Sequence, residues 1–180
     1  MSWDDITLCP NCGSFKIKAT KDPFDNYYYH CMCDNCNYDF DEPINKRELF
    51  KHNIYMNIAK EIAKLSHAKR SKVGAILVKD QRIIAEGYNG TPHGFNNNCE
   101  LEPDTTKPEV LHAESNAITK IARSTNSSEG SSLYVTMSPC FECAKLIIQA
   151  GIKEVFYNEE YRNIEGLDLL KKANIRIIKI

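Results

Sequence analysis

Two short motifs carry side chains that could perform hydrolytic chemistry around one metal ion. The first is His112-Ala113-Glu114, and the second is Pro139-Cys140-Phe141-Glu142-Cys143. Together they offer one imidazole, two thiolates and a carboxylate that is not needed as a ligand. This set can hold one Zn²⁺, leave its fourth position open for a water molecule, and place a proton-transfer group beside that water. The motifs therefore predict a catalytic zinc centre.

The spacing of these residues matches the H-x-E and P-C-x-x-C signature of zinc-dependent nucleobase deaminases. In that chemistry Glu114 would take the proton of the attacking water, then protonate the ring nitrogen and, in a separate transfer, finally protonate the leaving ammonia. We expect a dry pocket to raise the pKa of Glu114, because this carboxyl must change its protonation state during turnover. A Cys-x-x-C pair with a distant histidine can also be a structural zinc site. Three ligands instead of four, the position of the glutamate and the proline before the first cysteine favour the catalytic interpretation.

A second pair of Cys-x-x-C knuckles lies in residues 1–43. So short a segment cannot build an adequate core alone, and a metal ion held by four thiolates would supply its folding energy. The spacing predicts a small zinc ribbon with a structural Zn²⁺, and the alternative is a set of cysteines without a metal. Cys31 is left over and could replace one of the four or remain a free thiol. The four expected ligands are Cys9, Cys12, Cys33 and Cys36.

Composition and charge exclude several classes of function. The chain has 180 residues, of which 42% are hydrophobic, which suits one catalytic domain with a small appendage. No apolar run is long enough to span a bilayer, and the first five residues include two acidic residues and no basic one, so we expect a cytoplasmic protein without a signal peptide. The net charge is −1, and residues 1–43 contain eight acidic residues against three lysines. Binding to nucleic acid is therefore not expected of the appendage.

The first half of the main domain contains patterns of one long helix and one hairpin. Residues 45–66 have helical spacing, with apolar positions at Ile54, Ile58, Ile62 and Leu65 and with Leu49, Tyr55 and Ala59 alongside. Residues 73–78 form a buried strand that returns as residues 82–85 after a tight turn at residues 80–81. Residues 89–110, rich in Gly, Asn and Pro, are expected to form a loop.

The second half alternates between helices and strands, and it positions both motifs. A helix over residues 112–123 begins at the first motif, and a strand over residues 133–136 leads to a helix that starts at Pro139, carries both cysteines and stops at Gly151. A strand (153–157), a helix (164–173) and a last strand (175–180) follow. Right-handed crossovers make the last three strands parallel. With the hairpin they predict an α/β fold, a five-stranded mixed sheet with helices on both faces.

Residues 45–180 resemble the deoxycytidylate (dCMP) deaminase branch of the cytidine deaminase superfamily. The zinc motifs are shared across that superfamily, whereas the stretch from Gly87 to Pro92, followed by Gly94-Phe95 and Asn98-Cys99-Glu100, is typical of the dCMP branch. The resemblance implies a three-layer cytidine-deaminase-like domain over residues 44–180, to which residues 1–43 add the ribbon that ordinary members lack.

The resemblance also implies the activity and the residues that perform it. The expected reaction is hydrolysis of dCMP to dUMP and ammonia, which supplies thymidylate synthesis. Zinc would be held by His112, Cys140 and Cys143, with Glu114 as acid and base. Asn89 would bind the sugar 3′-hydroxyl or merely serve the turn, and Arg162 would bind the 5′-phosphate or merely pair with Glu160. The full expected substrate set is Asn89, Ala113, Ser138, Tyr161, Arg162 and, as a weaker phosphate candidate, Lys72.

Regulation and assembly are further implications of the resemblance. The family is typically a homohexamer that dCTP activates and dTTP inhibits, and a Mg²⁺ ion could accompany the effector. Effector contacts would fall on Gly90, Thr91 and Pro92. Some phage members hold a second zinc in a loop, but residues 89–111 offer only His93 and Cys99, so we do not expect that site here.

Three other functions are alternatives to dCMP deamination. A deaminase of dCTP, or of both nucleotides, differs only in how many phosphates the pocket admits. A nucleic-acid deaminase would use the ribbon for binding, which its acidity argues against. An inactive zinc scaffold would lack Glu114 or a zinc ligand, and none is missing.

Overall fold

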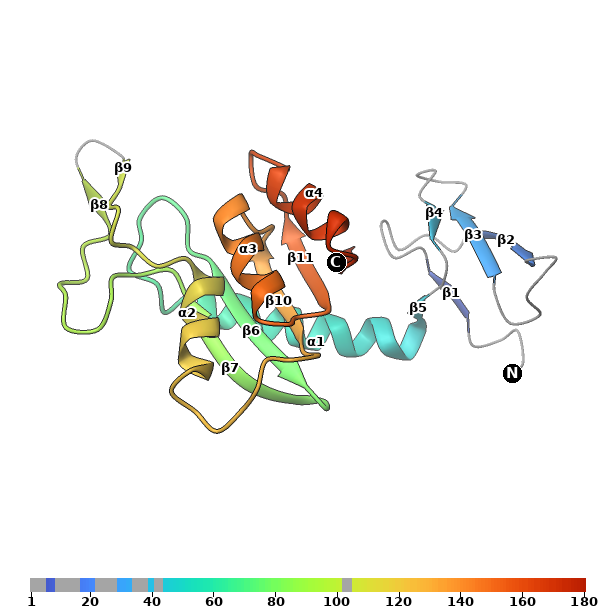
Figure 1. Ribbon diagram of the computed structural model, residues 1–180. Helices are drawn as coiled ribbons and strands as arrows, with labels where there is room; N and C mark the ends of the chain where they lie inside the picture. The colour runs from blue at the N-terminus through green and yellow to red at the C-terminus, as the bar shows by residue number, and fades with distance from the viewer. Residues whose placement is uncertain (1–5, 9–16, 22–28, 34–38, 41–43, 102–104) are drawn as a thin grey trace. The chain divides into compact units, whose positions relative to one another are not determined.

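The computed structural model (Figure 1) describes residues 6–8, 17–21, 29–33, 39–40, 44–101 and 105–180. The chain divides into two compact units. The N-terminal unit contains Met1–Ile54 and Ile178–Ile180, and the large unit contains Tyr55–Ile177. No helix of the described residues is both long and apolar enough to cross a membrane.

The N-terminal unit contains short antiparallel strands. β1 (Ile6–Leu8) pairs with β5 (Ile44–Asn45), and β2 (Ile17–Lys21), β3 (Tyr29–Cys33) and β4 (Asp39–Phe40) form a sheet in that order. The predicted zinc ligands Cys9, Cys12 and Cys36 lie outside the described residues, and only the backbone of Cys33 is described, in β3. The zinc ribbon therefore stays a prediction.

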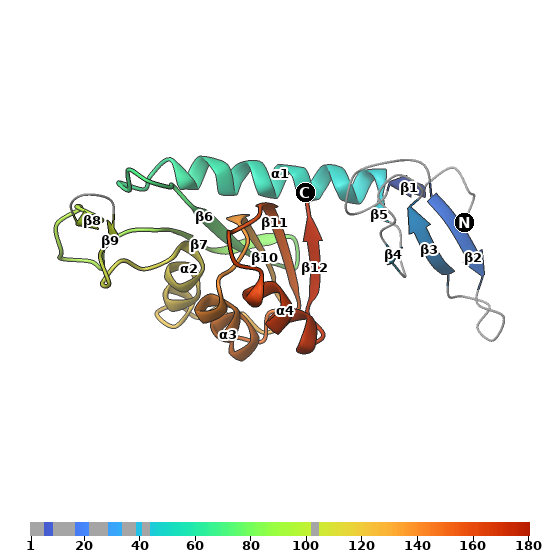
Figure 2. The same cartoon turned by 90° about the horizontal axis from the view of Figure 1, so that it is seen from above.

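The predicted mixed sheet of five strands is confirmed, in the order β12-β11-β10-β6-β7. β6 (Gly74–Lys79) pairs antiparallel with both β7 (Arg82–Tyr88) and β10 (Ser132–Met137). β10 pairs in parallel with β11 (Glu154–Glu159), and β12 (Arg176–Lys179) runs along the outer side of β11 in the same direction (Figure 2). The expected parallel arrangement of the last strands follows from the helices that connect them.

Helices cover both faces of this sheet, as predicted (Figure 2). α2 (Ala113–Ile121), α3 (Phe141–Gln149) and α4 (Glu165–Lys172) lie on one face, and α1 (Lys46–Ala63) lies on the other. Successive side chains of β10 point to opposite faces of the sheet. Leu133 and Val135 belong to the core beneath α2, α3 and α4. Tyr134 points to the opposite face, where its ring stacks on Phe156 with centroids 4.6 Å apart.

The buried face of α1 agrees in part with the predicted apolar set. Ala59 is buried and Ile58 and Ile62 are half-buried, whereas Ile54 and the nearby Leu65 are 44% and 55% exposed. Met56 and Ala63, which the spacing did not select, are also buried. The helix packs closely on β6, because a Cβ on Gly74 would clash with the carbonyl oxygen of Ala59, and small residues therefore face the sheet.

The connections confirm one prediction and correct another. The β6–β7 turn at Asp80 and Gln81 has φ angles of 49° and 62°, the left-handed pair of a tight type I′ hairpin. The expected loop over residues 89–110 contains a small antiparallel hairpin of β8 (Glu100–Leu101) and β9 (Thr105–Thr106). Strands of two residues carry no detectable hydrophobic periodicity, which explains why the sequence pattern missed them.

Candidate metal and substrate site

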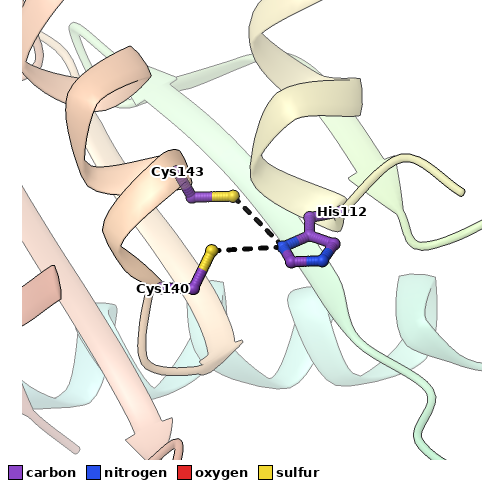
Figure 3. A group of neighbouring side chains, drawn as sticks. All are labelled: His112, Cys140 and Cys143. Atoms are coloured by element: carbon purple, nitrogen blue, oxygen red, sulfur yellow. Dashed lines mark hydrogen bonds between the residues drawn. The ribbon is translucent and has the colours of Figure 1, made fainter. Parts of the chain in front are cut away.

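The two motifs meet at the N-termini of two helices (Figure 3). His112 is the N-cap of α2, Cys140 is the N-cap of α3, and Cys143 lies in the first turn of α3. The helices thus begin one residue after His112 and two residues after Pro139, slightly later than predicted. The Nδ1 atom of His112 lies 3.4 Å from the Sγ atoms of both cysteines. Two helix N-termini therefore bring three ligand atoms together from segments 28 residues apart in the chain.

Glycines let the backbone approach closely at both ends of the site. A Cβ on Gly87 in β7 would clash with the carbonyl oxygen of Ala113 and the amide nitrogen of Ala117. A Cβ on Gly166 in α4 would clash with the carbonyl oxygen of Pro139. The first contact fixes α2, which begins after His112, and the second fixes the turn that carries Cys140.

The donor set fits zinc. The ligand atoms of His112, Cys140 and Cys143 all lie within 4.8 Å of one another, and zinc is bound by imidazole nitrogen and thiolate sulfur. A hydrogen bond from the Cys143 thiol lowers the pKa of Cys140 to about 3, so a thiolate is available as a ligand. The pKa of His112 is raised, chiefly by its hydrogen bond to Cys140. Three protein ligands leave a coordination position for water, as in catalytic zinc sites.

Glu114 has the environment that the sequence predicted for it. Its side chain is 4% exposed, and burial raises the pKa of its carboxyl. It lies in the first turn of α2, two residues after His112, and it does not belong to the group of candidate metal ligands. A raised pKa suits a carboxyl that must accept a proton from water and later give it to the substrate.

A cavity of about 570 Å³ opens onto these residues. Pockets of this size accept a nucleotide-sized ligand. Most of the predicted substrate residues line it, together with His112, Cys140 and several residues that the sequence did not single out. The polar and metal-binding part of the lining is Arg70, Ser71, Asn89, Glu100, Thr105, Thr106, His112, Glu114, Ser138, Cys140, Glu160, Tyr161 and Arg162.

Asn89 is held in place by the strand beside it. Its Oδ1 accepts a hydrogen bond from the backbone N–H of Val73 at 2.8 Å, and its Nδ2 donates to the carbonyl oxygen of Ser71 at 2.8 Å. These two bonds fix the amide at the wall of the cavity and use one of the two Nδ2 hydrogens. The side chain thus serves the local backbone and retains a donor for a ligand.

The segment after β11 brings the expected phosphate-binding residues to the same cavity. The guanidinium of Arg162 lies 5.6 Å from the centre of the Tyr161 ring, and both residues line the cavity. The Oγ of Ser138 accepts a hydrogen bond at 2.8 Å from the backbone N–H of Tyr161. Ala113 also lines the cavity. Lys72, in contrast, is exposed and is not among the lining residues.

Sequence reasoning missed Arg70, although it precedes β6 by only a few residues. Arg70 is positioned by the β8–β9 hairpin. Its Nη1 lies 3.4 Å from the Oγ1 of Thr106. The carboxylate of Glu100 also accepts a hydrogen bond at 2.8 Å from the backbone N–H of Lys69, the residue before Arg70. Since the hairpin itself was not predicted, no sequence signal connected Arg70 with the cavity.

The expected effector residues lie beside the cavity. Gly90 forms an isolated bridge with Leu111, and the Thr91 hydroxyl donates to the carbonyl oxygen of Asn96 at 2.7 Å. Neither Gly90, Thr91 nor Pro92 lines the cavity, so their effector role stays a prediction.

Comparison with known proteins places this arrangement in context. The family described as cytidine and deoxycytidylate deaminase zinc-binding region matches residues 50–159. ComE operon protein 2 of Bacillus subtilis is 42% identical over 124 residues, which cover 66% of this chain and 65% of that protein. Deoxycytidylate deaminase of phage T4 is 33% identical over 173 residues, covering 72% of this chain and 90% of that enzyme.

A solved structure shares the fold. The crystal structure of dCMP deaminase from cyanophage S-TIM5, in complex with dCMP and dUMP, superimposes with a TM-score of 0.72 at 47% identity. The match covers 76% of this chain and 100% of that chain. The cytidine-deaminase-like fold predicted from the sequence is thereby confirmed.

Proposed function

Because this chain belongs to the cytidine and deoxycytidylate deaminase family, we propose that it hydrolyses dCMP to dUMP and ammonia. The observation that carries the proposal is the buried Glu114 carboxyl beside the His112, Cys140 and Cys143 group, in a cavity that Arg162 also lines. The similar enzymes of phage T4 and cyanophage S-TIM5 bear the same activity in their names.

The chain's own residues account for the proton transfers. Zinc held by His112, Cys140 and Cys143 would supply Lewis acidity toward a water molecule. Glu114 takes a proton as water attacks the ring carbon that bears the amino group. It gives that proton to the ring nitrogen, then takes the remaining proton of the added hydroxyl group and gives it to the departing amine, so that one water is consumed and one ammonia is released. The buried position of Glu114 keeps bulk water away from these transfers.

The rest of the cavity would orient the nucleotide. The planar guanidinium of Arg162 suits bidentate binding of a phosphate, and stacking on Tyr161 limits its freedom. The fixed amide of Asn89 would hold the sugar through its second hydrogen. Ala113, which lines the cavity beside the metal-binding group, would border the base.

Ammonia release tests the proposal. The zinc-loaded protein is offered dCMP, dCTP, deoxycytidine and a cytosine-containing single strand in parallel, with Glu114→Ala as the control. We expect turnover of dCMP that the substitution abolishes. Turnover of the single strand alone would refute the proposal and indicate a nucleic-acid deaminase.

A deaminase of dCTP, or of both nucleotides, is the second candidate. Arg70 favours it, because the cavity contains a second guanidinium in addition to that of Arg162. A binding site for further phosphates would need such a charge. If dCTP is a substrate, Arg70→Ala should reduce kcat/KM for dCTP more than kcat/KM for dCMP.

The remaining features of the proposal concern metal content, assembly and regulation. We propose that Cys9, Cys12, Cys33 and Cys36 bind a structural zinc ion, which gives the chain two zinc sites. A cytoplasmic homohexamer, activated by dCTP and inhibited by dTTP with Mg²⁺, would follow from membership of the dCMP branch. Light scattering and assays with each effector would test assembly and regulation directly.

A further inference from the structure

A buried serine connects the metal-binding turn to the segment proposed to bind phosphate. Ser138 lies between β10 and Cys140, and its side chain is 3% exposed. Its Oγ accepts a hydrogen bond from the backbone N–H of Tyr161 at 2.8 Å, and its own N–H donates to the carbonyl oxygen of Glu159 at 2.8 Å. Two bonds therefore hold this residue against the end of β11.

The same two segments are in contact a second time through the helix that follows. The backbone of Pro139 and Cys140 packs so closely on Gly166 that a Cβ there would clash with both residues. Gly166 is buried in the first turn of α4. The stretch from Glu159 to Gly166, which contains Tyr161 and Arg162, is thus held at both ends by the turn that carries Cys140.

Between these two attachments the chain leaves the sheet. Arg162 and Ile164 are exposed, and no strand pairing of the described residues holds this stretch between β11 and α4. The Ser138 hydroxyl therefore fixes the Tyr161 amide at the point where the backbone turns from β11 into the cavity wall. Its loss would leave a backbone N–H without that partner and would let the turn move.

We propose that Ser138 is a positioning residue that sets the affinity of the enzyme for the 5′-phosphate by fixing Tyr161 and Arg162. This inference rests on the proposed function, because it needs Arg162 to bind the phosphate. The Ser138 hydroxyl then has no contact with the reacting atoms, and its effect reaches the substrate through the Tyr161 amide. Direct contact between this hydroxyl and the base is the competing explanation.

Substrates with and without phosphate separate these explanations. Loss of one hydrogen bond that orders Arg162 should raise KM for dCMP by about five- to tenfold in Ser138→Ala. It should leave kcat and zinc content close to those of the parent, and kcat/KM for deoxycytidine unchanged. Ser138→Thr, which keeps the hydroxyl, should restore KM. Direct contact with the base would instead reduce kcat/KM for both substrates equally.

Ser131 offers a matched control at the other end of the same strand. It is also a buried serine (1% exposed), and its hydroxyl donates to the carbonyl oxygen of Ser128 at 2.6 Å, away from the cavity. Ser131→Ala should lower the thermal midpoint of unfolding without changing KM for dCMP. If it changed KM as much as Ser138→Ala does, the effect would be general destabilisation and the inference would be wrong.

A double-mutant cycle with Arg162→Ala completes the test. Arg162→Ala alone should raise KM for dCMP, and adding Ser138→Ala should cause little further loss, because both act through one contact. If Arg162→Ala has no effect on dCMP, the assignment of Arg162 to the phosphate fails and the inference fails with it. If each single variant raises KM for dCMP and the two increases multiply in the double variant, the phosphate assignment stands and only the role of Ser138 is refuted.

Discussion

At the scale of single residues, the proposed metal ligands are distinct from the proposed proton-transfer group. His112 is the N-cap of α2 and Glu114 lies two residues later in its first turn, yet only His112 belongs to the candidate ligand group. Glu114 is buried, and the cost of burying a charge raises its pKa. One short motif can therefore provide both a ligand and an acid–base group, because successive side chains in the first turn of a helix point in different directions.

Glu114→Gln should test this division of roles. The substitution keeps the shape of the side chain and removes its ability to transfer a proton, so kcat for dCMP should fall by about 10³-fold. Zinc content should remain that of the parent, since the metal ligands are unchanged. The thermal midpoint should not fall, because an amide replaces a buried ionisable group. Activity is measured as ammonia release and metal by atomic absorption; loss of zinc in this variant would contradict the assignment.

The identity of these residues was predictable because the chemistry restricts both their types and their spacing. The ligand set and Glu114 followed from the two motifs alone, and the structure brings His112, Cys140 and Cys143 together as expected. The bond between Ser138 and Tyr161 was not predictable. It depends on the pairing of β10 with β11, which brings residues 23 positions apart into contact.

At the scale of helices and strands, glycines decide how closely the layers pack. Gly74 allows α1 to approach β6, and Gly87 allows α2 to approach β7. This packing explains why hydrophobic spacing predicted the existence of α1 but only part of its buried face. A helix pressed against a sheet presents small residues such as Ala63, and a pattern based on large apolar residues does not select them.

Gly87→Ala should disturb the site through α2. The added Cβ meets backbone atoms of Ala113 and Ala117, which cannot rotate away as a side chain could. We expect a loss of about 1–3 kcal/mol in the free energy of unfolding, measured by denaturant titration, and weaker zinc binding because the shifted helix begins next to His112. Gly90→Ala is the matched control, since its Cβ would meet only the Tyr88 ring at 3.7 and 3.8 Å. Equal stability of the two variants would contradict this account of the packing.

The β8–β9 hairpin shows where element-scale prediction ends. Its strands have two residues each and both are too short for a periodic pattern. The hairpin nevertheless positions Arg70 through Thr106, and both residues line the cavity. Short elements of this kind are determined by contacts with the rest of the domain, and a single sequence does not reveal those contacts.

At the scale of the whole molecule, the cavity belongs to one unit. Every residue that lines it lies between Ala68 and Arg162, within the large unit of Tyr55–Ile177. The metal ligands and Glu114 lie in the same range. The residues proposed to bind the substrate and the metal are therefore all supplied by the large unit.

This separation predicts how the two proposed zinc sites respond to loss of ligands. Cys12→Ser should reduce the zinc content from about two ions to about one per chain, because three thiolates no longer close a structural site. The N-terminal unit should then become sensitive to proteolysis, since metal binding would supply much of its folding energy. The activity per remaining zinc ion should stay close to that of the parent. Cys143→Ser, in contrast, should also remove one zinc ion but abolish deamination. If Cys12→Ser abolished activity while the ion at His112 remained bound, the N-terminal unit would have to contribute to catalysis, for instance through assembly of the active oligomer.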